Sequence, residues 1–200
     1  MVRSVARTAA AALLMAAPAA AQSHTWTIDT AHSLAEFSVR HMMVSNVKGT
    51  FGRVSGTATW DGRNLSAASV DVVIDAASID TRVAQRDTHL KSADFFDVER
   101  FPTLTFKSTK VESAGPGKAV ITGDLTIRGV TRSVTLDVIG PAPEVKGPDG
   151  SIRIGASATA SINRRDFGLV WNRVLDGGGV LVGDQVAITI EVELVRKSGA

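Results

Sequence analysis

Strict alternation of apolar and polar side chains constrains this chain more than any other feature of its sequence. Between Gln185 and Leu194 every second residue is aliphatic, and the residues between them are polar or small. A period of two predicts a β-strand with one face in a core and the other in water. The same alternation recurs at 121–127 and 131–138, and the short RGVT link at 128–131 predicts that these two strands form a hairpin.

Five further segments are expected to be strands, and turn-forming sequences separate them. They cover residues 33–41, 50–60, 68–75, 103–112 and 151–162. The turn signals are rich in Gly, Pro, Asp and Asn, as in DGRN, GPG and PEVKGPDG. About eight strands with short links predict an all-β domain, either a meandering antiparallel barrel or a sandwich. No internal repeat or linker indicates a second domain.

One helical excursion is expected near 82–92, where RVAQRDTHLK follows Asp80 or Thr81 as a candidate N-cap. The segment runs directly into an irregular stretch that is unusually rich in phenylalanine for a chain with 7 Phe in total. The rings concerned are Phe95, Phe96, Phe101 and Phe106. They are expected either to line the interior of the barrel or to seal its end, and the pattern leaves both open.

The first 21 residues have the pattern of a cleaved secretory signal peptide. Arg3 and Arg7 form a positive region, Ala9 to Ala17 an apolar run, and Ala19 to Ala21 a small-residue cleavage site. The apolar run is too short to span a bilayer as a helix, so no transmembrane segment is expected in the mature chain. We therefore expect residues 1–21 to be removed and residues 22–200 to form the mature domain.

Charge and cysteine content exclude several classes of function. The chain has 22 Lys+Arg and 20 Asp+Glu, and Arg3 and Arg7 leave with the signal peptide, so the mature domain is balanced in charge. A balanced domain gives no basis for binding nucleic acid. There is no cysteine, which excludes disulfides, thiol catalysis and Cys-ligated metals.

Small residues lie on the apolar faces of two expected strands. Ala156, Ala158 and Ala160 share one face of 151–162, and 50–60 carries two glycines and Ala58. Small side chains leave volume unfilled inside a barrel, which could then hold an elongated apolar ligand. The alternative is that Trp26, Trp60 and the phenylalanines fill that volume.

Strand parity gives the candidate residues that line the interior. They are expected to be apolar residues on one face of their strands, with a histidine at the barrel mouth and two rings of the aromatic stretch. The set is Ala35, Phe37, Val39, His41, Val54, Ala58, Trp60, Phe95, Phe96 and Phe106. A one-residue bulge would invert these assignments, because successive side chains of a strand point to opposite faces.

Evidence for catalysis or metal binding is sparse. His32 and His41 have opposite parity and lie about 30 Å apart along a strand, so they cannot form a two-ligand metal site. No nucleophile or zinc-protease motif is present. We expect no metal, no cofactor and no catalytic residue. An enzyme acting on a lipid-linked substrate is the alternative, and it requires His32 or His41 to meet an acid from 94–99 inside one pocket.

Four blocks in order resemble the YceI-like family. They are WTIDTAHSLAEFSVRHMMVSNVKGTF at 26–51, HLKSADFFDVERFPTLTFKST at 89–109, GDLTIRGVTRSV at 123–134 and NRRDFGL at 163–169. The resemblance covers essentially the whole mature chain. It implies a lipocalin-like antiparallel barrel of about eight strands, a lumen for a polyisoprenoid, isoprenoid quinone or fatty-chain lipid, and no catalytic activity.

The resemblance also implies a bacterial periplasmic or secreted location, in agreement with the signal peptide. The function we expect is therefore that of a periplasmic carrier of an apolar lipid. A stress-related structural domain with a filled barrel is a further alternative. A homodimer is compatible with the sequence, which does not define the oligomeric state.

Overall fold

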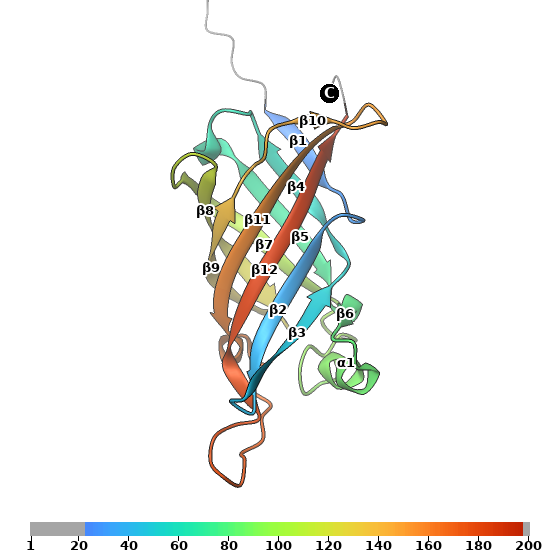
Figure 1. The fold of residues 1–200 in the computed structure, drawn as a ribbon, viewed down its shortest axis with the longest axis vertical. Helices are drawn as coiled ribbons and strands as arrows, with labels where there is room; N and C mark the ends of the chain where they lie inside the picture. Colours follow the sequence, from blue (N-terminus) through green and yellow to red (C-terminus); the bar gives the residue numbers. More distant parts are fainter. Residues whose placement is uncertain (1–22, 198–200) are drawn as a thin grey trace, which may run out of the picture.

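The alternating segments close into a ring of antiparallel strands in the computed structural model, which describes residues 23–197 (Figure 1). The strands are β1 (His24–Ile28), β2 (Leu34–His41), β3 (Ser45–Phe51), β4 (Val54–Trp60), β5 (Ser69–Asp75), β6 (Ile79–Asp80), β7 (Thr103–Ser113), β8 (Lys118–Ile127), β9 (Val130–Ile139), β10 (Val145–Lys146), β11 (Ile152–Asn163) and β12 (Val182–Arg196). The all-β prediction and the antiparallel barrel are confirmed.

The long pairing of β11 with β12 closes the barrel. Around the ring, the neighbours run β11, β9, β8, β7, β5, β4, β1 and β12, which is nearly the order along the chain. β12 then pairs with β11 over their full shared length, from Ile152↔Arg196 to Asn163↔Gln185. Closure leaves no long open edge in the ring and gives every strand one face toward a common interior.

Two pairs of strands act as single bent strands. β1 and β2 both pair with β12, at Leu194 and at Glu191 respectively, and a turn at 29–33 separates them. β3 and β4 bend in the same way at Gly52 and Arg53, each pairing with its own partner, β2 or β1. The predicted strand at 50–60 is thus the second half of a longer bent strand, and β1 was not predicted.

The helical excursion is present but begins later than expected. α1 spans Ala84–Lys91, and its N-cap is Val83, which makes no side-chain capping bond. Instead the Asp87 carboxylate accepts hydrogen bonds from the backbone N–H and the hydroxyl of Thr81, at 2.9 and 2.5 Å. Neither Asp80 nor Thr81 is therefore the N-cap. Short 3₁₀ turns occur at Leu65–Ala67, Ala76–Ser78 and Arg164–Phe167.

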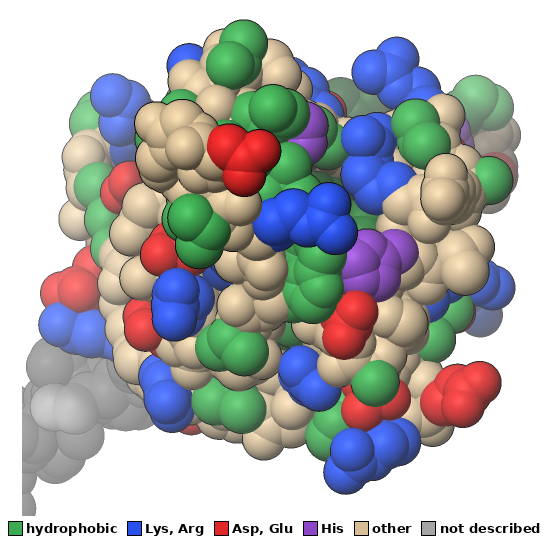
Figure 2. Space-filling view, turned by 90° about the horizontal axis from the view of Figure 1, so that it is seen from below, with side chains coloured by type: hydrophobic (Ala, Val, Ile, Leu, Met, Phe, Trp, Pro, Cys, Tyr) green, Lys and Arg blue, Asp and Glu red, His purple; other side chains and the backbone are tan. Residues whose placement is uncertain are grey.

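The two ends of the barrel differ. The upper end in Figure 1 carries β10 and both ends of the described chain, at β1 and β12. The lower end carries α1, the turn between β2 and β3, and the loop 170–181 before β12. Seen from below, hydrophobic side chains gather near the centre of this end with basic and histidine side chains beside them (Figure 2). No helix within residues 23–197 is long and apolar enough to cross a membrane.

The turn between β2 and β3 holds two methionines in a left-handed backbone conformation. Met42 and Met43 have φ of 50° and 60°, and Val44 N–H donates to His41 O at 2.9 Å. Positive φ is a conformation that Asn and Gly adopt at much lower cost than other residues. Both methionine side chains are exposed, at 44% and 56%. About half of each methionine is in solvent, so burial offsets the backbone strain only in part.

Replacing both methionines by the preferred turn residues is expected to stabilise the fold. Met42→Asn with Met43→Gly should raise the free energy of unfolding by about 1–2 kcal/mol, because left-handed backbone is costly for residues other than Gly and Asn. Urea denaturation measures the change. Met42→Ala with Met43→Ala is the control, since alanine keeps the strain. An equal gain in both double variants would show that backbone conformation is not the cause.

Candidate ligand-binding cavity

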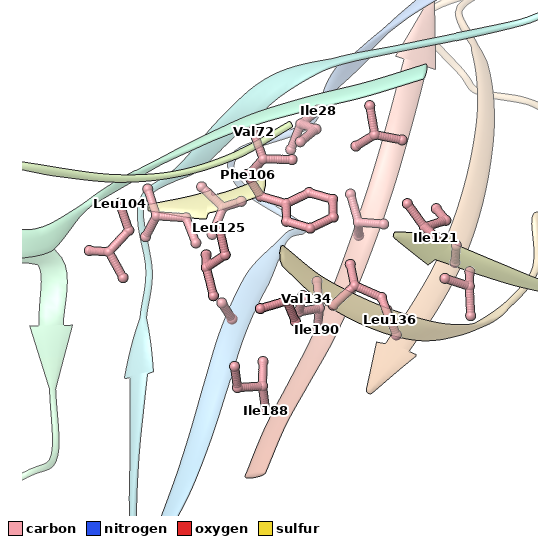
Figure 3. Close-up of a pocket in the computed structure, with 18 of the residues that line it drawn as sticks. Ile28, Val72, Leu104, Phe106, Ile121, Leu125, Val134, Leu136, Ile188 and Ile190 are labelled. Atoms are coloured by element: carbon pink, nitrogen blue, oxygen red, sulfur yellow. The ribbon is translucent and has the colours of Figure 1, made fainter. Parts of the chain in front are cut away.

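The barrel encloses an apolar cavity of about 310 Å³ that reaches from one end to the other. Its wall includes Trp60 and Pro141 near the upper end, and Leu90 and Phe96 near the lower end. Figure 3 shows the middle, where aliphatic side chains from strands around the ring converge on Phe106. The interior is therefore not packed solid by the protein's own rings.

Nine of the ten residues proposed from strand parity and from the aromatic stretch lie in the cavity wall. They are Ala35, Phe37, Val39, Val54, Ala58, Trp60, Phe95, Phe96 and Phe106. His41, proposed as a mouth residue, does not belong to the wall. It lies at the last position of β2, opposite Ser45 and Val182, where the β12 pairing has already shifted register. The cavity reaches this height, because Val182 opposite His41 lines it, but the His41 side chain is not part of the wall. Parity counted along one strand could not show the register shift just before this position.

Several wall residues were not proposed from the sequence. They come mainly from the inward faces of β8, β9 and β12, such as Ile121, Leu125, Val134, Leu136, Ile188 and Ile190 (Figure 3). The signal that identifies them is the same alternation that predicted their strands. Applying the parity argument to every strand would have found them, because a closed barrel has one interior shared by all strands.

Alanines on β11 keep the cavity open. Ala156 and Ala158 line it, and Ala158 faces Ile190 across the ladder to β12. Trp26, only 1% exposed, packs with Ala58 and Ile154 in a small cluster at the upper end. The indoles thus occupy one end of the interior and leave the middle of the cavity open.

Aromatic rings close the lower end. Phe51 contacts Phe37 and Phe96 at centroid distances of 5.9 and 5.5 Å, and all three line the cavity. His89 packs edge-on against Phe95 at 5.1 Å and against Trp171 at 4.8 Å. The phenylalanines of the aromatic stretch therefore both line and seal the barrel, and the two alternatives for them hold together.

Phe101 is the exception within that stretch. Its ring does not belong to the cavity wall and packs on the β8–β9 turn, where a Cβ on Gly129 would lie 2.8 Å from the ring. Gly129 also has φ +73°, so both sterics and backbone conformation favour glycine here. Next to it, Arg128 donates to Ala93 O at 2.7 Å and to Gly168 O at 3.2 Å. These bonds tie the loop after α1 to the lower rim.

Arg164 is a buried cation in the wall, and the protein uses all of its donors. The side chain is 5% exposed and forms an ion pair with Asp184 at 3.1 Å. Burial lowers the pKa of the guanidinium, and the Asp184 carboxylate opposes that shift. The guanidinium donates to the carboxylate and to the carbonyls of Leu169, Trp171, Val182 and Gly183. Arg164 therefore fixes the loop before β12 and has no donor left for a ligand.

The histidine and carboxylate pairs lie outside the cavity. His89 bonds Asp94 at 2.8 Å with side chains 39% and 54% exposed, and His32 bonds Asp29 at 2.9 Å. Within residues 23–197 the ionisable residues of the wall are Glu36 and Arg164, and Glu36 pairs with Lys48 at 2.9 Å. The convergence that an enzyme in this cavity requires, between His32 or His41 and an acid from 94–99, does not occur.

Asp29, His32 and Glu193 form a compact cluster at the bend between β1 and β2. Their ligand atoms lie within 4.8 Å of one another, but the Arg153 guanidinium sits among them and donates to both carboxylates. The hydrogen bond from His32, followed by that from the Ala31 N–H, lowers the pKa of Asp29 to about 2. The same contact raises the pKa of His32. The cluster is an ion-pair network that holds the bend.

Comparison with known proteins decides the family. The family model described as the YceI-like domain matches residues 26–194. The chain belongs to the YceI-like family.

Similar proteins occur in Vibrio and Staphylococcus species. The UPF0312 protein VVA0736 of Vibrio vulnificus is 40% identical over 162 residues, which cover 79% of this chain and 84% of the relative. The UPF0312 protein SAS2572 of Staphylococcus aureus is 36% identical over 168 residues, covering 84% and 95%.

Several solved structures have the same fold as this chain. The Campylobacter jejuni YCEI protein is 33% identical with a TM-score of 0.64, covering 79% of this chain and 90% of that one. Burkholderia cenocepacia BcnA has a TM-score of 0.71 at 25% identity, covering 83% and 98%. A structure described as a polyisoprenoid binding domain from Saccharophagus degradans has a TM-score of 0.60 at 16% identity, covering 84% and 97%, and is alike in fold alone.

Arg164→Lys is expected to destabilise this YceI-like barrel by about 3 kcal/mol. An ammonium has three donors where the guanidinium has five, so buried carbonyls of the 169–183 loop lose their partners. Urea denaturation measures the loss, and hydrogen exchange should show faster exchange in that loop. Arg165→Lys is the matched control, because Arg165 is exposed and reaches Asp184 only at 3.8 Å. Equal effects of the two substitutions would contradict the role given to Arg164.

Asp29→Asn is expected to flatten the acid limb of the stability profile. The folded-state pKa of Asp29 lies below its usual 3.8, at about 2, so its contribution to stability is present above the usual value and is lost as the pH falls toward the lower one. Unfolding free energy measured across that window should fall less steeply in the variant. His32→Gln should weaken the slope in the same direction. If the pH dependence of the unfolding free energy is unchanged in both variants, the Asp29–His32 pair does not contribute to acid stability.

Proposed function

We propose that this protein is a non-catalytic binding protein that holds one elongated apolar ligand inside its barrel. The ligand class is a polyisoprenoid, an isoprenoid quinone or a fatty-chain lipid. We propose further that the protein is exported to the bacterial periplasm, or secreted, and carries this ligand through water.

The observation that carries the proposal is the length and apolarity of the cavity. Lining residues of β12 run from Val182 to Leu194, about 40 Å along the strand at ~3.3 Å per residue, or roughly 30 Å along a barrel with strands tilted by about 40°. A volume of about 310 Å³ spread over that length suits a single hydrocarbon chain better than a compact ligand. This volume is at the low end of the usual range for ligand pockets, roughly 300–1,000 Å³.

The energetics favour affinity with loose selectivity. Burying about 500 Å² of ligand hydrocarbon would contribute roughly 12 kcal/mol at ~25 cal/mol/Å². The loss of ligand and side-chain freedom would leave about half of that or less. Shape and hydrophobicity are therefore the main source of binding, as in a carrier that must also release its ligand.

Membership of the YceI-like family and the fold shared with a protein described as a polyisoprenoid binding domain support binding rather than catalysis. The wall supports it as well, because its one buried cation is fully hydrogen-bonded and the histidines lie elsewhere. The proposed location rests on the signal-peptide pattern of residues 1–21, which lie outside the described residues.

Native mass spectrometry of protein purified gently from its own host tests the proposal directly. We expect an adduct mass that organic extraction releases as a lipid with a long hydrocarbon chain. The purified protein should also take up isoprenoid quinones or fatty amides from solution. A spectrum without adduct, together with no uptake of either compound, would overturn the carrier function.

Neighbouring valines on β5 provide a matched pair for mutation. Val72 lines the cavity, whereas Val73 faces outward and is 37% exposed. Val72→Asp should weaken uptake of an isoprenoid quinone by about a hundredfold or more, since an unpaired charge in an apolar site costs several kcal/mol. Val73→Asp should leave uptake unchanged.

Val72→Thr extends this test to a variant that keeps the shape of the side chain. It should fold normally and weaken uptake by a smaller factor, because a hydroxyl replaces one methyl group. Circular dichroism confirms folding of all three variants. If folded Val72→Asp and Val73→Asp take up the quinone equally, the ligand does not occupy the barrel interior.

A further inference from the structure

Buried hydrogen-bond donors without partners gather at the upper end of the barrel. Within residues 23–197, the buried side-chain polar atoms that lack a hydrogen-bond partner are the indole nitrogens Nε1 of Trp26 and Trp60 and the Nε of Arg196. Buried polar groups are almost always paired, so each such atom in a folded protein requires an explanation. Here all three atoms are donors, and all three lie in one region.

The strand register brings these side chains together. On paired strands β1 and β4, Trp26 is opposite Ala58, and His24 is opposite Trp60, so the two indoles are diagonal neighbours on the inward face. Both line the cavity and belong to one hydrophobic cluster. Arg196, at the end of β12, has its guanidinium carbon 5.1 Å from the centroid of the Trp26 ring.

The chemistry of these groups defines what would complement them. An indole N–H and the Nε of arginine can only donate, so their partner must be an acceptor. The charge of Arg196 is already balanced by Glu144, whose carboxylate oxygens lie 3.0 and 3.3 Å from Nη2. A second anion there would leave a negative charge without a free counterion. A neutral oxygen, such as a carbonyl or ether, fits the donors best.

We propose that the upper end is a receptor for a neutral oxygen acceptor of the ligand, which the indoles of Trp26 and Trp60 bind. The inference rests on the proposed function and specifies its ligand class: a long apolar chain that ends in a carbonyl-type oxygen. The chain then extends down the barrel toward Leu90 and Phe96, and the oxygen sets its direction. A pure hydrocarbon fits the same cavity and leaves both indoles unpaired.

Competition between ligands of matched chain length tests the proposal. Hexadecyl methyl ketone, octadecane, octadecylamine and hexadecyl phosphate are offered in pairs to the full mature chain, and native mass spectrometry gives their relative occupancy. We expect the ketone to be favoured over octadecane by about twofold to tenfold for each hydrogen bond formed. The amine, which is a donor, and the phosphate, which is an anion, should both bind less well than the ketone.

Tryptophan-to-phenylalanine substitutions remove the donors and retain aromatic rings. Trp26→Phe and Trp60→Phe should each lower the ratio of ketone to octadecane toward one. Trp171→Phe is the control, because Trp171 lies at the opposite end of the barrel, and it should leave the ratio unchanged. Equal occupancy of ketone and octadecane in the unmodified protein would overturn this inference while leaving the carrier function in place. Failure of every probe to bind would overturn both.

The NMR signals of the indole N–H groups provide a second test, which does not depend on the stability of a variant. In the unmodified protein, the ¹H–¹⁵N signals of Trp26 and Trp60 should move downfield when the ketone is added and much less with octadecane. The signal of Trp171 should respond equally to the two ligands. Signals of Trp26 and Trp60 that do not distinguish the ketone from octadecane would show that their N–H groups bind no ligand oxygen.

Discussion

The continuous ladder between β11 and β12 is the constraint on which the rest of the structure depends. It closes the sheet, and closure turns one face of every strand toward a shared interior. The paired strands bring Ala156 opposite Val192 and Ala158 opposite Ile190, so a small side chain faces a larger one at both pairs. The cavity follows from this arrangement. Closure fixes the width of the barrel, and the alanine side chains are too short to fill its interior.

The two ends of the barrel close by different means. The lower end relies on rings and on loop carbonyls held by Arg164, whose donors are all used. The upper end has three buried donors that no described residue satisfies. A hydrocarbon chain has a similar binding energy at many positions along an apolar channel. One hydrogen bond at an end, by contrast, favours a single orientation of the ligand. With the proposed ligand bound, the asymmetry of the ends would give the chain one orientation in the cavity.

Much of the fold could be predicted because alternation is a local signal. It identified the long strands after residue 103, the hairpin through Arg128 and Gly129, and seven residues of the cavity wall, whereas the two-residue strand β10 was not predicted. The bend at Gly52 was missed because β3 and β4 follow each other directly in the sequence. They differ only in their pairing partners, since β3 pairs with β2 and β4 with β1. The absence of His41 from the wall was missed for a related reason: the register between β2 and β12 shifts just before it, and parity counted along one strand does not show such a shift.

The unpaired indole N–H groups could not be predicted from sequence patterns. Trp26 and Trp60 were identified as candidates to fill the interior, and Trp60 also as a wall residue, because aromatic rings on an inward face are ordinarily core. Whether an indole N–H has a partner depends on the residues across the barrel, and here neither Nε1 has one although both rings are packed into one cluster. A side chain chosen only to fill space would be better as phenylalanine, which has no donor to desolvate. Two indoles at this end are explained if a guest supplies the missing oxygen.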